Sequence, residues 1–282
     1  MSIKNKSIRI NDKIVIGQDH PLFLIAGPCV IENRDHAMFM AKEIQSICSD
    51  LDMPFIFKAS YDKANRSSIH SYRGPGLEKG LDILRQIKEN LDIPVLSDVH
   101  EPGHLHLAAR VLDIIQIPAL LCRQTDLILE TARSKKPVNI KKGQFLSPYE
   151  VKNIIDKFLS QDNDNIMLTE RGTFFGYNNL VVDIRSIPIM RKWGYPVVID
   201  ASHSVQRPGG EGDSSGGDFE FIPYIARAGV SAYADGVFLE VHDTPAQSRS
   251  DRHNSFNLNK LHDLLSSLLS IQKALARHPQ MH

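Results

Sequence analysis

The chain has 282 residues, enough for one large α/β domain or two smaller ones, and its 33 basic and 33 acidic residues balance. This balance excludes general binding to nucleic acid or to anionic membranes, because both need an excess of basic charge. The opening segment MSIKNKSIRI has no apolar signal core, and the longest apolar region, 111–122, is too short to span a bilayer. Three cysteines, an odd number, fit a reducing compartment better than a disulfide framework. We therefore expect a soluble, cytoplasmic protein with no nucleic-acid and no membrane partner.

The predicted elements begin with a β-hairpin at about 7–16, where SIRINDKIVIG alternates around Asn11-Asp12. Eight short apolar runs follow, each bounded by turn residues: 22–27, 54–59, 94–99, 113–118, 137–142, 165–170, 196–201 and 236–241. Amphipathic helical patterns lie between several of them, as at 35–48, 77–91 and 147–159, and a leucine-rich pattern at 258–275 follows the last.

Eight alternating β and α units with no linker between them predict a single (β/α)₈ TIM barrel over residues 1–282. The barrel proper would run from about 22 to 276, with the hairpin closing its N-terminal end. A doubly wound sheet is the rival fold, but it usually has fewer strands and a glycine fingerprint after the first. The nearest match here, GPGLEKG, has the wrong spacing and context.

Chemically active residues gather where these strands end. In barrels of this kind the catalytic groups lie at the carboxyl ends of the strands. The predicted strand ends carry Cys29, Lys58, Ser60, Asp98, His100, Gln116, Lys141, Lys142, Glu170, Arg171, Asp200, His203 and Glu240. Burying unpaired charge is costly, so this pattern indicates a functional site. Side-chain alternation puts Lys141 on the face of Asn139, toward the barrel interior, and favours it over Lys142.

The loop after the second strand is unusually basic. Its cations can converge with those of other strands, the full set being Lys58, Lys63, Arg66, Lys141 and Arg171. Arginine offers phosphate a fork of donors and lysine a compact charge, so this set can bind two phosphorylated or carboxylated substrates. The alternative is a solvated loop with scattered surface ion pairs. A convergent polar pocket favours the anion site.

A second constellation consists of Cys29, His203, Glu240 and Asp251. One thiol, one imidazole and two carboxylates suit Zn²⁺, Fe²⁺, Mn²⁺ or Co²⁺ better than Mg²⁺. The first, seventh and eighth strands, which carry the first three, are neighbours once a barrel closes. The spacing alone favours the alternative, a buried small Cys29 and a structural His203, because no CxxC or HxxxH pattern is present. His242 lies level with Glu240 and is a rival ligand.

Seven motifs carry a resemblance to a known family that extends from about Ser7 to Leu275: FKASYDKANRSSIHSYRGPGL, SDVHEP, RQTDL, NIKKGQF, ERGTFFGYNNLVVD, DASHSVQ and SGGDFEF. With them the chain resembles the 3-deoxy-D-manno-octulosonate 8-phosphate synthases, also called 2-dehydro-3-deoxyphosphooctonate aldolases. The run KANRSS at 63–68 is highly specific. The sister family that makes the seven-carbon shikimate precursor has KPRT in its place.

The resemblance implies a transferase that condenses phosphoenolpyruvate with D-arabinose 5-phosphate and water and releases inorganic phosphate, in Kdo and lipopolysaccharide biosynthesis. The alternatives are the sister reaction, which makes 3-deoxy-D-arabino-heptulosonate 7-phosphate, or a sugar-phosphate-binding barrel without turnover. The resemblance also implies a homotetramer, in which Arg66 and Ser67 reach the sugar phosphate in a neighbouring subunit's site.

By the same resemblance, phosphoenolpyruvate is expected to contact Lys58, Ser60, Lys63, Gln116, Lys141 and Arg171. Asn65 and Asp98 are expected to contact the pentose phosphate. The expected catalytic residues are Lys63, Asp98 and His203, with Lys63 as proton donor to the alkoxide and Asp98 aligning the sugar hydroxyls.

Position 29 is a cysteine, as in the metal-dependent members of the family that the chain resembles, whereas the metal-independent members have asparagine there. The resemblance therefore implies a divalent metal (Zn²⁺, Fe²⁺, Mn²⁺ or Co²⁺) bound by Cys29, His203, Glu240 and Asp251.

Overall fold

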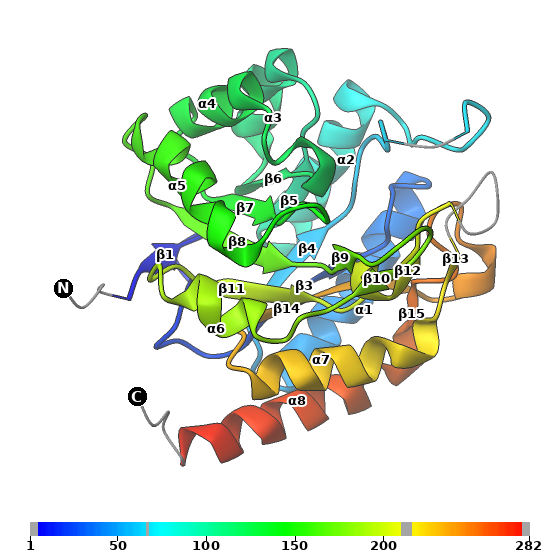
Figure 1. Ribbon diagram of the computed structural model, residues 1–282. Helices are drawn as coiled ribbons and strands as arrows, with labels where there is room; N and C mark the ends of the chain where they lie inside the picture. The colour runs from blue at the N-terminus through cyan, green and yellow to red at the C-terminus, as the bar shows by residue number, and fades with distance from the viewer. Residues whose placement is uncertain (1–4, 66–67, 210–215, 278–282) are drawn as a thin grey trace.

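The computed structural model describes residues 5–65, 68–209 and 216–277, and a closed ring of eight parallel strands forms its centre (Figure 1). The strands are β3 (Phe23–Gly27), β4 (Phe55–Lys58), β5 (Val95–Asp98), β6 (Ile114–Ile117), β7 (Val138–Lys141), β8 (Ile166–Glu170), β11 (Val197–Asp200) and β14 (Gly236–His242). Each pairs with the next in parallel, and β14 pairs with both β11 and β3, which closes the ring. The eight predicted strands and the (β/α)₈ class are confirmed.

Helices connect the strands and form the outer layer (Figure 1). They are α1 (Arg34–Asp50), α2 (Leu77–Leu91), α3 (Leu105–Val111), α4 (Thr125–Arg133), α5 (Val151–Leu159), α6 (Ser186–Arg191), α7 (Ile222–Ser231) and α8 (Leu261–Ala276). The pattern predicted at 147–159 is a helix only from Val151, because Ser147 and Glu150 form a capping box around a 3₁₀ turn that begins with Pro148. None of the helices in the described ranges is long and apolar enough to span a bilayer.

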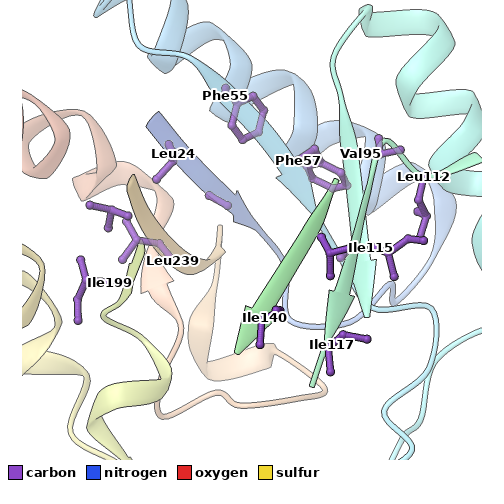
Figure 2. Close-up of a cluster of buried hydrophobic side chains, with 14 of the residues drawn as sticks. Leu24, Phe55, Phe57, Val95, Leu112, Ile115, Ile117, Ile140, Ile199 and Leu239 are labelled. Atoms are coloured by element: carbon purple, nitrogen blue, oxygen red, sulfur yellow. The ribbon is translucent and has the colours of Figure 1, made fainter. Parts of the chain in front are cut away.

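Side chains alternate between two apolar layers along each barrel strand. The outer layer packs between the strands and the helices and includes Leu239, Leu24 and Phe57 on the adjacent strands β14, β3 and β4, and Ile115 on β6 (Figure 2). This layer anchors each strand, and therefore fixes which way the alternate, inward-facing side chains point.

The inner layer fills the barrel and ends at the N-terminal hairpin of β1 (Ser7–Arg9) and β2 (Val15–Gly17). Ile8 and Ile16 of the hairpin are buried against the inward-facing Ile25, Ile56 and others. The hairpin therefore closes the N-terminal end of the barrel, as predicted, and leaves the carboxyl end for the site.

The loops at the carboxyl end carry short strands of their own. These are β9 (Thr173–Phe174) with β10 (Leu180–Val181), β12 (Gln206–Arg207) with β13 (Gly216–Gly217), and β15 (Phe256–Asn257), which pairs in parallel with the end of β14. In Figure 1 they lie at the end of the barrel opposite β1.

The ends of β3 and β4 approach each other closely enough to need a glycine. A Cβ on Gly27 would lie 2.0 Å from the Lys58 carbonyl oxygen.

Candidate active site at the carboxyl end of the barrel

A cavity of about 260 Å³ opens among the carboxyl ends of the strands. Most of the predicted substrate contacts line it, namely Lys58, Lys63, Asn65, Asp98, Gln116, Lys141 and Arg171, together with His203 and Asp251. Arg66 and Ser67 lie outside the described residues. Side chains that are far apart in the sequence thus meet around one small polar space.

Lys58 and Lys141 enter the cavity from the inward-facing positions at the ends of β4 and β7. Lys58 is 1% exposed, and its Nζ lies 2.9 Å from Glu240 Oε1. Lys141 forms an ion pair with Asp200, and its Nζ lies 3.2 Å from the centre of the Phe238 ring. Burial lowers the pKa of Lys141 to about 8 even though Asp200 opposes the shift. Burial therefore makes the charged form of Lys141 costly despite Asp200, and an anion bound beside it would offset that cost.

Arg171 follows β8 and is also buried, at 5% exposure. One of its terminal nitrogens, Nη2, donates to Gln206 Oε1 at 3.0 Å, while Nη1 has no hydrogen-bond partner in the part of the chain that the structure describes. Burial lowers the pKa of this guanidinium, although Asp200 and other acids counteract it. A buried, unpaired donor on a permanent cation is a strong feature of an anion-binding site.

Asp98 is the centre of a hydrogen-bonded group on the other side of the cavity. Ser60 Oγ donates to Asp98 Oδ1, and His100 Nε2 lies 3.1 Å from Asp98 Oδ2. Burial by itself would raise the pKa of Asp98, but Lys63 and His100 outweigh it and hold the pKa well below its usual range. Asp98 is therefore a carboxylate that can accept hydrogen bonds from a hydroxyl. Ser60 is fully buried and is not among the described residues that line the cavity.

The predicted metal ligands approach one another at the edge of this cavity. Cys29 Sγ lies 2.9 Å from Asp251 Oδ2, and His203 Nε2 lies 3.5 Å from Glu240 Oε1 and 3.7 Å from Asp251 Oδ2. Ligands about 2.0–2.3 Å from one tetrahedral ion are themselves about 3.3–3.8 Å apart. Glu240 Oε2 is buried and has no hydrogen-bond partner within the described ranges. The donor types suit a divalent transition metal, and the two His203 distances fall in this range, whereas Cys29 and Asp251 are closer together, at hydrogen-bond distance.

Two further features bear on this set of four ligands. Burial, followed by the charge of Asp251, raises the pKa of Cys29 to about 12, so the side chain is a thiol unless a cation stabilises the thiolate. His203 Nδ1 lies 2.7 Å from Asp200 Oδ2, which holds the ring with Nε2 toward Glu240 and Asp251. A carboxylate behind an imidazole is the usual partner of a histidine ligand.

The sequence placed Asp200 among the strand-end residues but gave it no partner or role, and the structure pairs it with both Lys141 and His203. Gln206, the last residue of the motif DASHSVQ, was not predicted as a site residue and accepts a hydrogen bond from Arg171. The preference for Lys141 over Lys142 agrees with the structure, because Lys142 points away and donates to the Leu146 carbonyl oxygen at 3.1 Å. Glu240 and His242 both face inward on β14, and His242 was a rival to Glu240 as a metal ligand. His242 Nε2 lies 3.4 Å from Glu32 Oε1 instead, outside the set of four ligands.

Fold and site together define a parallel (β/α)₈ barrel with a buried polar cavity at its carboxyl end, lined by both cations and carboxylates. Comparison with known sequences then gives the family. A sequence model of the DAHP synthetase I family matches residues 2–277, and the chain belongs to this family.

Curated relatives give a more specific relationship. A 2-dehydro-3-deoxyphosphooctonate aldolase of Geotalea uraniireducens (strain Rf4) is 57% identical over 258 residues, which cover 92% of this chain and 95% of the relative. A protein of the same name from Desulfatibacillum aliphaticivorans is 54% identical, over 94% of this chain and 97% of the relative. Another from Desulfosudis oleivorans (strain DSM 6200 / JCM 39069 / Hxd3) is 55% identical, over 95% of this chain and 96% of the relative. The family resemblance stated from the motifs is therefore confirmed.

Proposed function

We propose that this protein condenses phosphoenolpyruvate with D-arabinose 5-phosphate and water, giving 3-deoxy-D-manno-octulosonate 8-phosphate and inorganic phosphate. The observation that carries the proposal is the convergence of Lys58, Lys63, Lys141 and Arg171 on one cavity. Both substrates are anions. Glu240 and Asp200 balance Lys58 and Lys141, but Arg171 Nη1 has no hydrogen-bond partner within the described residues, and a bound anion would satisfy it. The names of the curated relatives support the eight-carbon product.

Phosphoenolpyruvate is assigned to the side of the cavity that holds Lys58, Lys141 and Arg171. The burial of Lys141, which lowers its pKa, and the unpaired Nη1 of Arg171 both favour a bound phosphate or carboxylate there. Holding the enol phosphate rigidly beside the aldehyde converts a reaction between two solutes into one within a complex, and this positioning lowers the barrier.

The pentose phosphate is assigned to the side of Asn65 and Asp98. Asp98 remains ionised and would accept hydrogen bonds from sugar hydroxyls, which aligns the aldehyde carbon. Arg66 and Ser67 are proposed to contact the phosphate of this sugar in a neighbouring subunit.

In the reaction, C3 of the enol phosphate forms a bond to the aldehyde carbon, and the aldehyde oxygen becomes an alkoxide that takes a proton. Water adds at C2, and the bond from C2 to the phosphate oxygen breaks. Lys63 is the proposed proton donor. Burial opposes its charge, but Cys29, once it is a thiolate, and Asp98 outweigh burial and raise the pKa of Lys63. Lys63 therefore carries a proton at neutral pH, and the same shift makes it a weaker acid than a free lysine.

We further propose that Cys29, His203, Glu240 and Asp251 hold a divalent metal, Zn²⁺, Fe²⁺, Mn²⁺ or Co²⁺. When bound, such an ion would act as a Lewis acid toward the aldehyde or the water. The chain's own contribution is to orient His203 through Asp200 and to keep Lys58 beside Glu240, which balances the negative charge of the ligands.

A homotetramer in the cytoplasm is proposed as the working form. Aromatic side chains around β9 and β10 are exposed, namely Phe145 (46%), Tyr149 (63%), Phe174 (44%), Phe175 (67%) and Tyr177 (98%), and exposed apolar groups of this extent are typical of subunit contacts. Light scattering would then give a mass of about four times 31.7 kDa.

A two-substrate phosphate-release assay with added Mn²⁺ or Zn²⁺ tests the function. Release is expected with phosphoenolpyruvate and D-arabinose 5-phosphate together, and none with either compound alone. Faster release with D-erythrose 4-phosphate would instead support the sister reaction, and binding of both ligands without release would support a non-catalytic barrel.

A further inference from the structure

A second group of possible metal ligands lies outside the cavity. It consists of Glu32 in the loop after β3, His36 in the first turn of α1, and His242 at the end of β14. One ligand atom from each lies within 4.8 Å of the other two. None of the three lines the cavity or belongs to the set around Cys29. The group is therefore separate from the site proposed for catalysis.

The two imidazoles have unpaired nitrogens. His242 is 4% exposed, and its Nε2 makes only a long contact with Glu32 Oε1, at 3.4 Å, and no well-aligned hydrogen bond within the described residues. His36 Nδ1 is likewise buried and without a partner among those residues. Buried imidazole nitrogens are normally satisfied, so two such atoms beside one carboxylate need an explanation.

Asp243 explains why these particular nitrogens remain unpaired. Its Oδ1 lies 3.0 Å from His36 Nε2 and 2.9 Å from His242 Nδ1, so one carboxylate contacts the far nitrogen of both rings. His242 Nδ1 accepts the Thr244 amide proton at 3.0 Å, so in the metal-free protein the ring proton is on Nε2, which faces Glu32. Coordination through Nε2 requires the proton on Nδ1 instead, where Asp243 accepts it and the Thr244 amide gives up its bond to the ring. A carboxylate behind a histidine ligand is the arrangement found at metal sites.

We infer that Glu32, His36 and His242 form a second binding site for a divalent transition metal, with Asp243 as the positioning carboxylate for both histidines. Two imidazoles and a carboxylate suit Zn²⁺, Co²⁺ or Ni²⁺ better than Mg²⁺ or Ca²⁺, which prefer oxygen ligands. Two neutral imidazoles and two carboxylates also match the charge of a divalent ion. Such an ion would tie the start of α1 to the end of β14 near the catalytic cavity.

Co²⁺ titration of the metal-free protein distinguishes the two sites, because a Cys29 thiolate gives a sulfur-to-metal charge-transfer band and the second site has no sulfur. Wild-type protein is expected to bind two Co²⁺ per chain, only one of them with that band. His36→Leu is expected to bind one Co²⁺ and to keep the band. Asp243→Asn should weaken the second site by about 10–100-fold without removing it.

The controls separate this inference from the proposed function. His262→Leu, a change at an exposed histidine on α8, should bind Co²⁺ as the wild type does. Glu32→Gln provides a second ligand variant if thermal unfolding shows that His36→Leu is not folded. In a Cys29→Ala background, which lacks the charge-transfer band, the band-free Co²⁺ should still disappear with His36→Leu or Glu32→Gln. Binding of a single Co²⁺ that shows the band, with no band-free Co²⁺, or band-free binding unchanged in both variants, would overturn the inference. A single Co²⁺ without the band, lost in His36→Leu, would instead refute only the four-ligand set around Cys29.

Discussion

Replacing Lys141 with methionine tests the anion site at the residue whose electrostatics are most informative. Burial holds the pKa of Lys141 at about 8, compared with an ordinary value of 10.5. If a bound anion restores the ordinary pKa, the charged side chain binds the anion more tightly than a neutral one by about 2.5 pKa units. At about 1.4 kcal/mol per unit this is about 3 kcal/mol, or on the order of 100-fold in Kd. At pH 7 the Kd of phosphoenolpyruvate should rise by this factor in Lys141→Met.

Calorimetric titration with phosphoenolpyruvate alone measures this effect, and Lys142→Met is the matched control. Lys142 is equally buried but faces away from the cavity, with its Nζ 3.6 Å from Glu170 Oε2. Its loss should destabilise the fold, since breaking a buried ion pair costs about 3–5 kcal/mol, and leave the Kd nearly unchanged. A wild-type Kd in Lys141→Met, or an equal loss of affinity in Lys142→Met, would refute the assignment of the anion site to this face.

Three other predictions follow from the same geometry. Because the free enzyme's Lys141 has its pKa near 8 and a bound anion raises it, phosphoenolpyruvate affinity should fall as the pH rises above about 8. Binding at pH 9 should take up a proton, which calorimetry in buffers of different ionisation enthalpy detects, and Lys141→Met should abolish the uptake. Cys29→Ala should lose the metal bound by Cys29, His203, Glu240 and Asp251, which elemental analysis measures, and most of the phosphate release. Cys29→Asn is expected to retain activity that a chelator does not remove. Gly27→Ala should lower the free energy of unfolding in urea by roughly 1–3 kcal/mol or more, because its Cβ would lie 2.0 Å from the Lys58 carbonyl oxygen; an unchanged unfolding midpoint would contradict the close approach of these two strands.

The barrel could be predicted from sequence because each strand is a short apolar run with turn residues at both ends. Outer-layer residues such as Leu24 and Phe57, and inner-layer residues such as Ile25 and Ile56, are all apolar, so the runs are continuous and easy to find. Helix starts were harder, since the 3₁₀ turn at Pro148 has the same residue pattern as a helical first turn.

The cationic side of the site was also predictable, because strand alternation directs Lys58 and Lys141 inward. The approach of Cys29 to Asp251 was not predictable from spacing: 222 positions separate them, and only closure of the ring brings them together. Family resemblance supplied that set. The role of Asp200 and the presence of Gln206 in the site were not predicted, because a counter-ion or a hydrogen-bond partner has no sequence signature of its own.

A crystal structure of the protein with phosphoenolpyruvate bound would test the central claim most directly. The claim predicts the phosphate and the carboxylate of the ligand inside the cavity, within hydrogen-bond distance of Lys141 Nζ and Arg171 Nη1. Ligand bound only at another basic surface, such as the groove lined by Arg185 and Lys192, with the barrel cavity empty, would contradict it.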